Sequence, residues 1–291
     1  MNARAAAAIV LAAAAAGCAS RAAPPPAPES GFATSADGVP IAWDARGAGE
    51  PAVVLVHGWR CDRGLWRWTA EDLARDHRVV CVDVGGHGAS GADRGKWDVE
   101  ALAGDVQAVV EALGLRRVVL VGHSMGGPIC LAAAPRLKGR VAAVVGVDTL
   151  HDVEYHMPKE AVEPVIASLE ADPEKGIRGF LPSMLAPGYD PALLDWLVAR
   201  GMAADHRAAC AIMRSLTVTD SAALLENAGV PVRCVNAMPG VTAFARPTEV
   251  AKNRKHGDFD AVLLEGVGHY PMVERPDAFN ARLREVIAPL R

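Results

Sequence analysis

Residues 117–126 read RVVLVGHSMG and combine an unbroken apolar run with a G-x-S-x-G pentapeptide. The β-branched run 117–121 is typical of a strand buried on both faces, and an Ala-rich stretch compatible with a helix follows the pentapeptide. Glycine on either side of Ser124 permits a strand-to-helix turn too tight for larger residues, with the serine hydroxyl exposed. The turn also places Ser124 at a helix N-terminus, where free amides and the helix dipole favour developing negative charge. Ser124 is therefore the candidate nucleophile.

Similar apolar runs on both sides of this stretch predict a central sheet. They are 51–56 (PAVVLV), 78–84 (RVVCVDV), 141–147 (VAAVVGV), 230–235 and 260–264. Segments 65–75 and 99–113, whose apolar residues have helical spacing, separate the earlier runs. This alternation predicts an α/β protein with a mostly parallel sheet of about eight strands and helices on both faces. With 291 residues and 51% hydrophobic content, the chain is long enough for one such domain with an insertion.

The segment 151–227 interrupts the strand pattern. It is mostly helical in pattern and contains six prolines, at 158, 164, 173, 182, 187 and 191. Because it follows a predicted sheet strand, we expect it to form a helical cap over the mouth of the site. The core is then built from two parts, residues 31–150 and residues 228–291.

The N-terminus has the features of a targeting sequence. Residues 1–17 contain one early arginine and an unbroken apolar stretch that is too short to span a bilayer. The small residues before Cys18 resemble a bacterial lipobox, which predicts a signal peptide over 1–17 and a lipid anchor on Cys18. Residues 18–30 are rich in Pro and Ala and predict a tether. We expect a bacterial cell-envelope protein, either lipid-anchored or, after ordinary signal cleavage, periplasmic or secreted.

Charge and cysteine content exclude several classes of partner. The chain has 30 Lys+Arg against 34 Asp+Glu and no dense basic run, which argues against nucleic-acid binding and leaves Cys18 as the predicted membrane contact. Five further cysteines lack close spacing and do not form a CxxC motif or a Cys/His cluster, so no metal site is predicted. Cys81 and Cys234 lie within apolar runs and are predicted to be small buried hydrophobic residues, although one disulfide remains possible.

Four motifs in sequence order carry a resemblance to a known family. They are HGW at 57–59, DVGGHGAS at 83–90, GHSMG at 122–126 and GHYP at 268–271. Over nearly all of residues 35–290 the chain resembles the α/β-hydrolase fold. The resemblance implies an oxyanion hole built from two backbone amides, those of Trp59 and Met125, because a tetrahedral oxyanion needs donors fixed in place.

A serine nucleophile needs a general base within hydrogen-bond reach. His269 follows the last predicted strand and lies in a glycine-flanked turn, in the loop where the family places its base. His57, His87 and Asp83 belong to the other two motifs. For these three we expect the structural roles of bracing backbone and shaping turns.

The carboxylate that would orient His269 is not in its usual place. After the strand 230–235, residues 236–242 read NAMPGVT and contain no carboxylate. Asp148 directly follows the strand 141–147 and is the predicted acid, an arrangement that resembles haloalkane dehalogenases with a relocated acid. Asp152, or no carboxylate at all, is the alternative.

These residues favour a carboxylesterase-like serine hydrolase (EC 3.1) that acts through an acyl-enzyme. Its partner would be a small-molecule acyl substrate, and the chemistry requires neither a metal nor an organic cofactor. Two alternatives stay open: a non-catalytic small-molecule binding protein on the same fold, and a cofactor-free perhydrolase or oxygenase.

Overall fold

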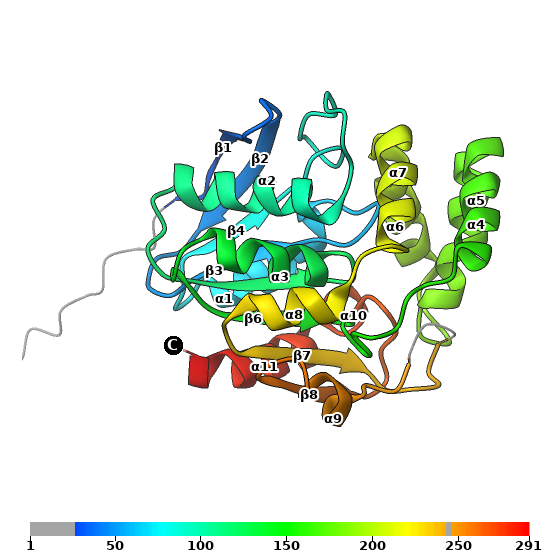
Figure 1. Ribbon diagram of the computed structural model, residues 1–291. Helices are drawn as coiled ribbons and strands as arrows, with labels where there is room; N and C mark the ends of the chain where they lie inside the picture. The colour runs from blue at the N-terminus through cyan, green and yellow to red at the C-terminus, as the bar shows by residue number, and fades with distance from the viewer. Residues whose placement is uncertain (1–26, 243–245, 291) are drawn as a thin grey trace, which may run out of the picture.

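The computed structural model describes residues 27–242 and 246–290, so the predicted signal peptide, Cys18 and most of the predicted tether lie outside the described residues. One sheet of eight strands has the order β1-β2-β4-β3-β5-β6-β7-β8. The predicted α/β class, with a mostly parallel sheet of about eight strands, is confirmed (Figure 1). The strands are β1 Glu29–Thr34, β2 Pro40–Arg46, β3 Ala52–Val56, β4 Val79–Val82, β5 Val118–His123, β6 Val141–Val147, β7 Val232–Ala237 and β8 Phe259–Leu264.

The first two strands form an antiparallel hairpin at one edge of the sheet, and β2 also pairs antiparallel with β4. The remaining pairs are parallel. Because β1 begins at Glu29, residues 29 and 30 belong to the sheet and not to the tether predicted over 18–30. Their pairing with Ala45 and Asp44 explains this difference, since a cross-strand partner far along the sequence cannot be read from local composition.

Helices cover both faces of the sheet. Alternate residues of β3 point to opposite faces, so that Val54 contributes to the core on one side and Leu55 to the core on the other. The first face is covered by α2 (Val99–Ala112), α3 (Gly126–Arg136) and α8 (Ser221–Ala228), and the second by α1 (Arg67–Leu73), α10 (Pro271–Glu274) and α11 (Pro276–Ile287), as Figure 1 shows. Short α9 (Val250–Asn253) precedes β8.

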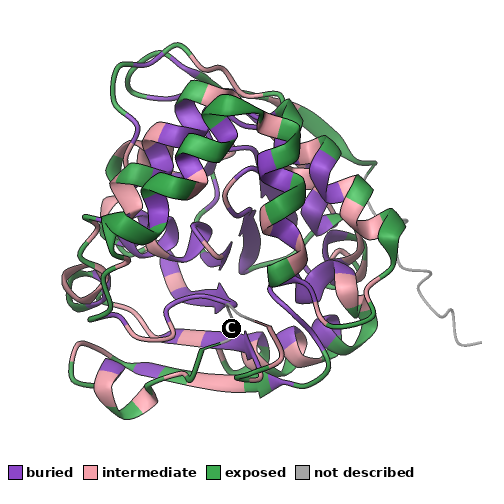
Figure 2. Cartoon of the chain, turned by 90° about the vertical axis from the view of Figure 1, so that its right-hand side faces the viewer, coloured by how far each residue is buried: buried purple, intermediate pink, exposed green. Residues whose placement is uncertain are grey.

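The segment between β6 and β7 supplies a helical cap. It contains α4 (Lys159–Ala171), α5 (Pro173–Phe180), a 3-10 turn η2 (Leu181–Met184), α6 (Pro191–Ala203) and α7 (His206–Leu216). These elements lie beyond the carboxyl ends of the parallel strands (Figure 1). Figure 2 shows that the outer faces of the cap helices are exposed and that their inner faces are buried. The last helix of the segment, α8, instead packs against α3 in the layer that covers the sheet, because Leu225 and Ala228 are buried in that core.

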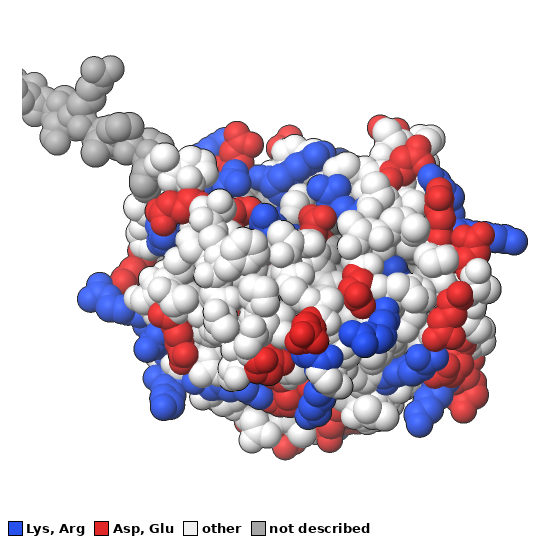
Figure 3. Space-filling model, turned by 90° about the horizontal axis from the view of Figure 1, so that it is seen from above, with Lys and Arg blue, Asp and Glu red and all other residues white. Residues whose placement is uncertain are grey.

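The surface is mixed in charge. In Figure 3, Lys and Arg are interspersed with Asp and Glu over the face shown. Within residues 27–242 and 246–290, no single helix is long and apolar enough to cross a membrane; α7 and α8, bent by 84° to each other, pass that test only as a pair.

Candidate active site

The candidate nucleophile Ser124 lies in a sharp turn between β5 and α3. Its φ of 51° is in the left-handed region, where a residue with a side chain is strained. A Cβ on Gly122 would lie 2.1 Å from the carbonyl oxygen of Gly126, and a Cβ on Gly126 would lie 2.6 Å from that of Val56. The two glycines of the pentapeptide therefore permit the close approach of β3, β5 and α3 that this turn requires.

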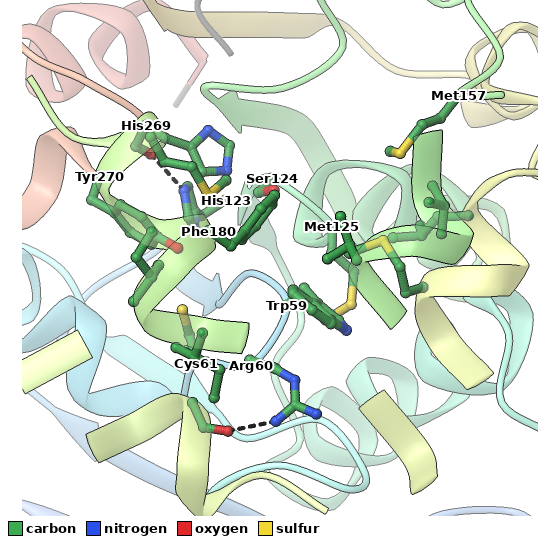
Figure 4. Close-up of a pocket in the computed structure, with 18 of the residues that line it drawn as sticks. Trp59, Arg60, Cys61, His123, Ser124, Met125, Met157, Phe180, His269 and Tyr270 are labelled. Atoms are coloured by element: carbon green, nitrogen blue, oxygen red, sulfur yellow. Dashed lines mark hydrogen bonds between the residues drawn. The ribbon is translucent and has the colours of Figure 1, made fainter. Parts of the chain in front are cut away.

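His269 lies in the loop after β8, and hydrogen bonds hold its backbone on both sides. Its amide donates to the carbonyl oxygen of Met184 in the cap at 2.7 Å. Its carbonyl oxygen lies 2.7 Å from Nε2 of His123, which donates this bond (Figure 4). Residue 123, the variable position before Ser124 in the pentapeptide, thus fixes the loop of the candidate base. Sequence reasoning assigned no role to His123.

Glu274 provides a second support for the same loop. Its carboxylate accepts the amides of Gly268 and Tyr270, each at 2.9 Å, and the amide of Ala186 in the cap, also at 2.9 Å. One side chain therefore joins the loop of His269 to the segment that follows η2. Sequence reasoning missed Glu274, because only the folded cap brings Ala186 to it.

Asp148, at the end of β6, is the carboxylate that lies against His269. Its Oδ2 accepts a hydrogen bond from Nδ1 of His269 at 2.6 Å, and its Oδ1 accepts the amide of Ala237 at 2.9 Å. Asp148 is only 2% exposed. Asn236, near the end of β7, is also buried and uses its side-chain oxygen to accept the amide of Thr149 at 3.2 Å. The strand that usually carries the acid thus has an amide side chain with its own partner.

Asp152, the alternative acid, is directed elsewhere. Its Oδ2 lies 2.8 Å from Nζ of Lys252 in an ion pair that is partly exposed to solvent. The structure brings Asp148 and His269 together and leaves Asp152 in this separate pair.

A second imidazole lies beside the Asp148 carboxylate. Nε2 of His151 is 3.3 Å from Oδ1, on the other side of the carboxylate from His269. Burial by itself raises the pKa of Asp148, but the imidazoles of His151 and His269 outweigh it and hold the pKa well below its usual range. Asp148 is therefore ionised at neutral pH, and its bond to Nδ1 leaves Nε2 as the basic nitrogen of His269.

Ser124 and His269 both line one cavity beneath the cap, with a volume of about 390 Å³. Figure 4 shows the Ser124 oxygen on the side of the cavity where the His269 ring lies. Much of the lining is apolar, contributed by Val162, Leu169, Ile177, Phe180, Met184 and Leu197. Cys61 also reaches the cavity, but burial raises the pKa of its thiol to about 12, so it is protonated at neutral pH.

The two residues predicted to supply the oxyanion amides line the same cavity as Ser124. Met125 precedes the first residue of α3, where helix amides lack partners within the helix. Trp59 lies in the loop after β3, and its ring Nε1 donates to the carbonyl oxygen of Ala209 in α7 at 2.7 Å. Both residues line the cavity, and Figure 4 shows them on the same side of Ser124.

His57 and His87 brace backbone. Nδ1 of His57 donates to the carbonyl oxygen of Gly58 at 2.7 Å, and its Nε2 accepts the amide of Val84 at 3.2 Å. Nε2 of His87 accepts the amide of Arg60 at 3.2 Å. A ring nitrogen that accepts an amide hydrogen carries no proton, so both rings are neutral.

Asp83 and the cysteines have structural surroundings. Asp83 pairs with Arg63 and accepts the amide of Ala89 at 2.8 Å, which shapes the turn after β4. Across the described part of the chain, the five cysteines are buried and unpaired, and no group of three or more His, Cys, Asp or Glu is arranged to hold a metal. The disulfide left open by the sequence therefore does not form among these five.

Comparisons with known proteins find relatives and solved structures that share this fold. The family model described as alpha/beta hydrolase fold matches residues 51–190. The chain is 27% identical to a pimeloyl-acyl-carrier-protein methyl ester esterase of Nitrosospira multiformis (80% of this chain, 93% of the relative). It is 23% identical to the Karrikin insensitive 2 receptor CA of Petunia hybrida (79% and 89%). A putative aryl esterase from Burkholderia cenocepacia superposes with a TM-score of 0.76 at 25% identity (90% and 99%).

The eight-stranded sheet and the turn at Ser124 give the chain the α/β-hydrolase fold, and the family match over residues 51–190 agrees with this fold. Proteins named as esterases are among its relatives and among the structures that superpose on it. Another relative is named as a receptor.

Proposed function

We propose that the protein is a carboxylesterase-like serine hydrolase in which Ser124 is the nucleophile, His269 the general base and Asp148 the acid of the triad. The observation that carries the proposal is the 2.6 Å hydrogen bond between buried Asp148 and Nδ1 of His269, at a cavity that Ser124 also lines. An ionised carboxylate in that position fixes the tautomer of the imidazole and stabilises its charged form.

The reaction proceeds in two acyl transfers. Nε2 of His269 takes the hydroxyl proton of Ser124 while the oxygen attacks the ester carbonyl carbon. The amides of Trp59 and Met125 stabilise the resulting oxyanion. When the carbon–oxygen bond to the leaving group breaks, His269 returns the proton to the departing alcohol, and the acyl group remains on Ser124. Water, deprotonated by His269, then attacks the acyl carbon to form a second oxyanion. The bond between this carbon and the Ser124 oxygen breaks, His269 returns the proton to Ser124, and the acid is released.

Hydrolysis of p-nitrophenyl esters of graded chain length tests this mechanism. We expect Ser124→Ala and Asp148→Asn to lower kcat by about 10³-fold or more, since each removes one member of a unit that acts together. Asp152→Asn is the matched control, because its carboxylate pairs with Lys252, and it should keep nearly full activity. Loss of activity in Asp152→Asn with retention in Asp148→Asn would refute the assignment of the acid.

Labelling with a fluorophosphonate probe separates an enzyme from a binding protein. An activated Ser124 forms a stable phosphonyl adduct, which Ser124→Ala abolishes. A folded protein whose Ser124 stays unlabelled, and which hydrolyses no ester of the series, would favour the binding protein instead.

A further inference from the structure

Arg60 is a buried cation at the wall of a mostly apolar cavity. The other arginine of the lining, Arg246, is exposed, and its guanidinium lies against Tyr155. Arg60 directly follows Trp59 in the loop after β3, is only 5% exposed, and is among the residues that line the cavity with Ser124. Its φ of 54° is in the left-handed region. Figure 4 shows its side chain beyond Trp59, at the opposite end of the view from His269.

The polar contacts of the guanidinium leave its charge without a paired anion. One terminal nitrogen donates to the carbonyl oxygen of Gly201 at 2.7 Å and the other to Nδ1 of His206 at 2.9 Å. Nε is buried and has no hydrogen-bond partner. Within the described residues, no carboxylate forms an ion pair with Arg60; Asp205 acts on it only through its more distant charge.

An unpaired buried charge destabilises the folded protein because it loses its hydration, and buried charges in proteins are therefore normally paired. Burial lowers the pKa of Arg60, while Cys210 and Asp205 partly oppose this effect. An arginine nevertheless stays protonated in proteins. The indole of Trp59, whose ring centre lies 5.3 Å from the guanidinium carbon, offers a weak cation–π contact and no negative charge. An anion that enters the cavity would therefore gain a desolvated partner already fixed in place.

A second hollow, next to the cavity, could accommodate the leaving group of the ester. It meets the cavity at Ser124 and His269 and includes the exposed residues Pro247 and Glu249. His269, which must protonate the alcohol, thus borders the exposed side, while the mostly apolar cavity extends beneath the cap. This arrangement assigns the acyl chain to the cavity.

We propose that the substrate is an ester whose acyl chain is apolar along its length and ends in a carboxylate, which pairs with Arg60. This inference rests on the proposed function and specifies its substrate class. The contacts of Arg60 with Gly201 and His206 also join the loop after β3 to the cap, so the test must separate recognition of an anion from this structural contribution.

Arg200 offers a matched control for that separation. Its Nε lies 3.2 Å from Oδ1 of Asp62, so it too joins the loop after β3 to α6. Unlike Arg60, it is not among the residues that line the cavity. Arg60→Met and Arg200→Met each remove a guanidinium that links the same two elements, but only the first removes a cation from the cavity.

The experiment compares pairs of esters that differ in the terminal group. Mono-p-nitrophenyl adipate is paired with p-nitrophenyl hexanoate, and mono-p-nitrophenyl suberate with p-nitrophenyl octanoate. For the better-fitting pair, we expect Arg60→Met to lower the ratio of anionic to neutral kcat/KM by about tenfold or more, as the loss of a charged hydrogen bond implies. Arg60→Lys should retain part of the ratio, and Arg200→Met all of it. Equal losses on both esters of each pair in Arg60→Met would overturn the proposal.

A binding measurement tests recognition of the anion apart from turnover. Ser124→Ala protein, with and without Arg60→Met, is titrated with monomethyl suberate and with methyl octanoate, and the shift of its thermal midpoint reports the affinity. Tighter binding of the carboxylate by about tenfold that Arg60→Met abolishes supports the proposal. Equal affinities, or a preference that persists without Arg60, overturn it; a persisting preference would point to Arg246, which also lines the cavity. If the wild type hydrolyses neither ester and Ser124 resists the fluorophosphonate, the proposed function fails, while this titration still tests recognition of the anion.

Discussion

Three buried histidines around the site perform different tasks because their hydrogen bonds differ. His57 and His87 accept backbone amides and are thereby kept neutral, whereas His123 donates to the carbonyl oxygen of His269. Burial, together with neighbouring imidazoles, lowers the pKa of His87 and of His123 to about 3. Burial of both rings thus favours their neutral form in the folded protein, so protonation and folding oppose one another.

This opposition predicts a loss of stability in mild acid. The unfolded chain binds protons at these histidines below about pH 6.5, while the folded chain does so only near pH 3. The stabilisation is therefore complete above pH 6.5 and is lost as the pH falls, by about 1.4 kcal/mol per pH unit for each such histidine. Urea unfolding at pH 7.5, 6.5 and 5.5 measures the slope, which His87→Asn should reduce. The exposed His156→Asn is the control; an equal slope in wild type and His87→Asn would contradict this account.

The sequence was sufficient to predict which residues meet at the site, but not how they are supported. Ser124 and His269 stand in motifs whose local context defines them, and Asp148 was predicted because residues 236–242 lack a carboxylate. The structure brings these three residues to one site. The charge of Arg60 and the brace at Glu274 depend on contacts with the cap, and no local pattern indicates which cap residues close over them.

The loop after β8 and the 3-10 turn η2 act as one structural unit. The amide of His269 donates a hydrogen bond to the carbonyl oxygen of Met184. A Cβ on Gly268 would lie only 2.4 Å from this oxygen. Glu274 adds bonds to both segments. The position of the base therefore depends on a segment of the cap as well as on the sheet.

Substitution of Glu274 tests this dependence. Glu274→Gln replaces one acceptor oxygen by an amide group that would face backbone N–H donors, so the loop should shift by enough to misplace His269. We expect kcat to fall by about tenfold or more with a smaller change in KM. Glu265→Gln, at an exposed position just after β8, is the control. A kcat equal to that of the wild type in Glu274→Gln would show that the sheet alone positions the base.

Two elements show where pattern reading was limited. The edge strand β1 begins within a segment whose composition predicted a tether, because pairing with β2 outweighs local preference. Helix α8 looked like a continuation of the cap, since its helical pattern follows directly from that of α7. Its burial against α3 is a tertiary contact that helical periodicity does not specify.

Across the whole molecule, the carboxyl ends of the parallel strands present the reactive groups and the cap encloses them (Figure 1). Ser124 follows β5, Asp148 follows β6 and His269 follows β8, so three strand ends of one sheet supply the proposed triad.

Acylation of Cys18 is the remaining prediction for the full chain. In a bacterial host grown with an alkyne-tagged palmitate, we expect the wild type to carry the label and to sediment with membranes until detergent is added. Cys18→Ser should lose both properties, because the thiol is the acylated group. A wild type that is unlabelled and recovered from the periplasm would instead indicate ordinary signal cleavage.

The bond between His269 and Met184 has a consequence for the timing of turnover. If the segment of the cap that carries Met184 lifts to admit substrate, it gives up the contact that aligns the imidazole. Entry of the substrate and reaction then cannot coincide. His269 is misaligned while the cap is open, and it is aligned again only when the cap has closed over the substrate. Bulk water that enters the cavity while the cap is open therefore meets a misaligned His269.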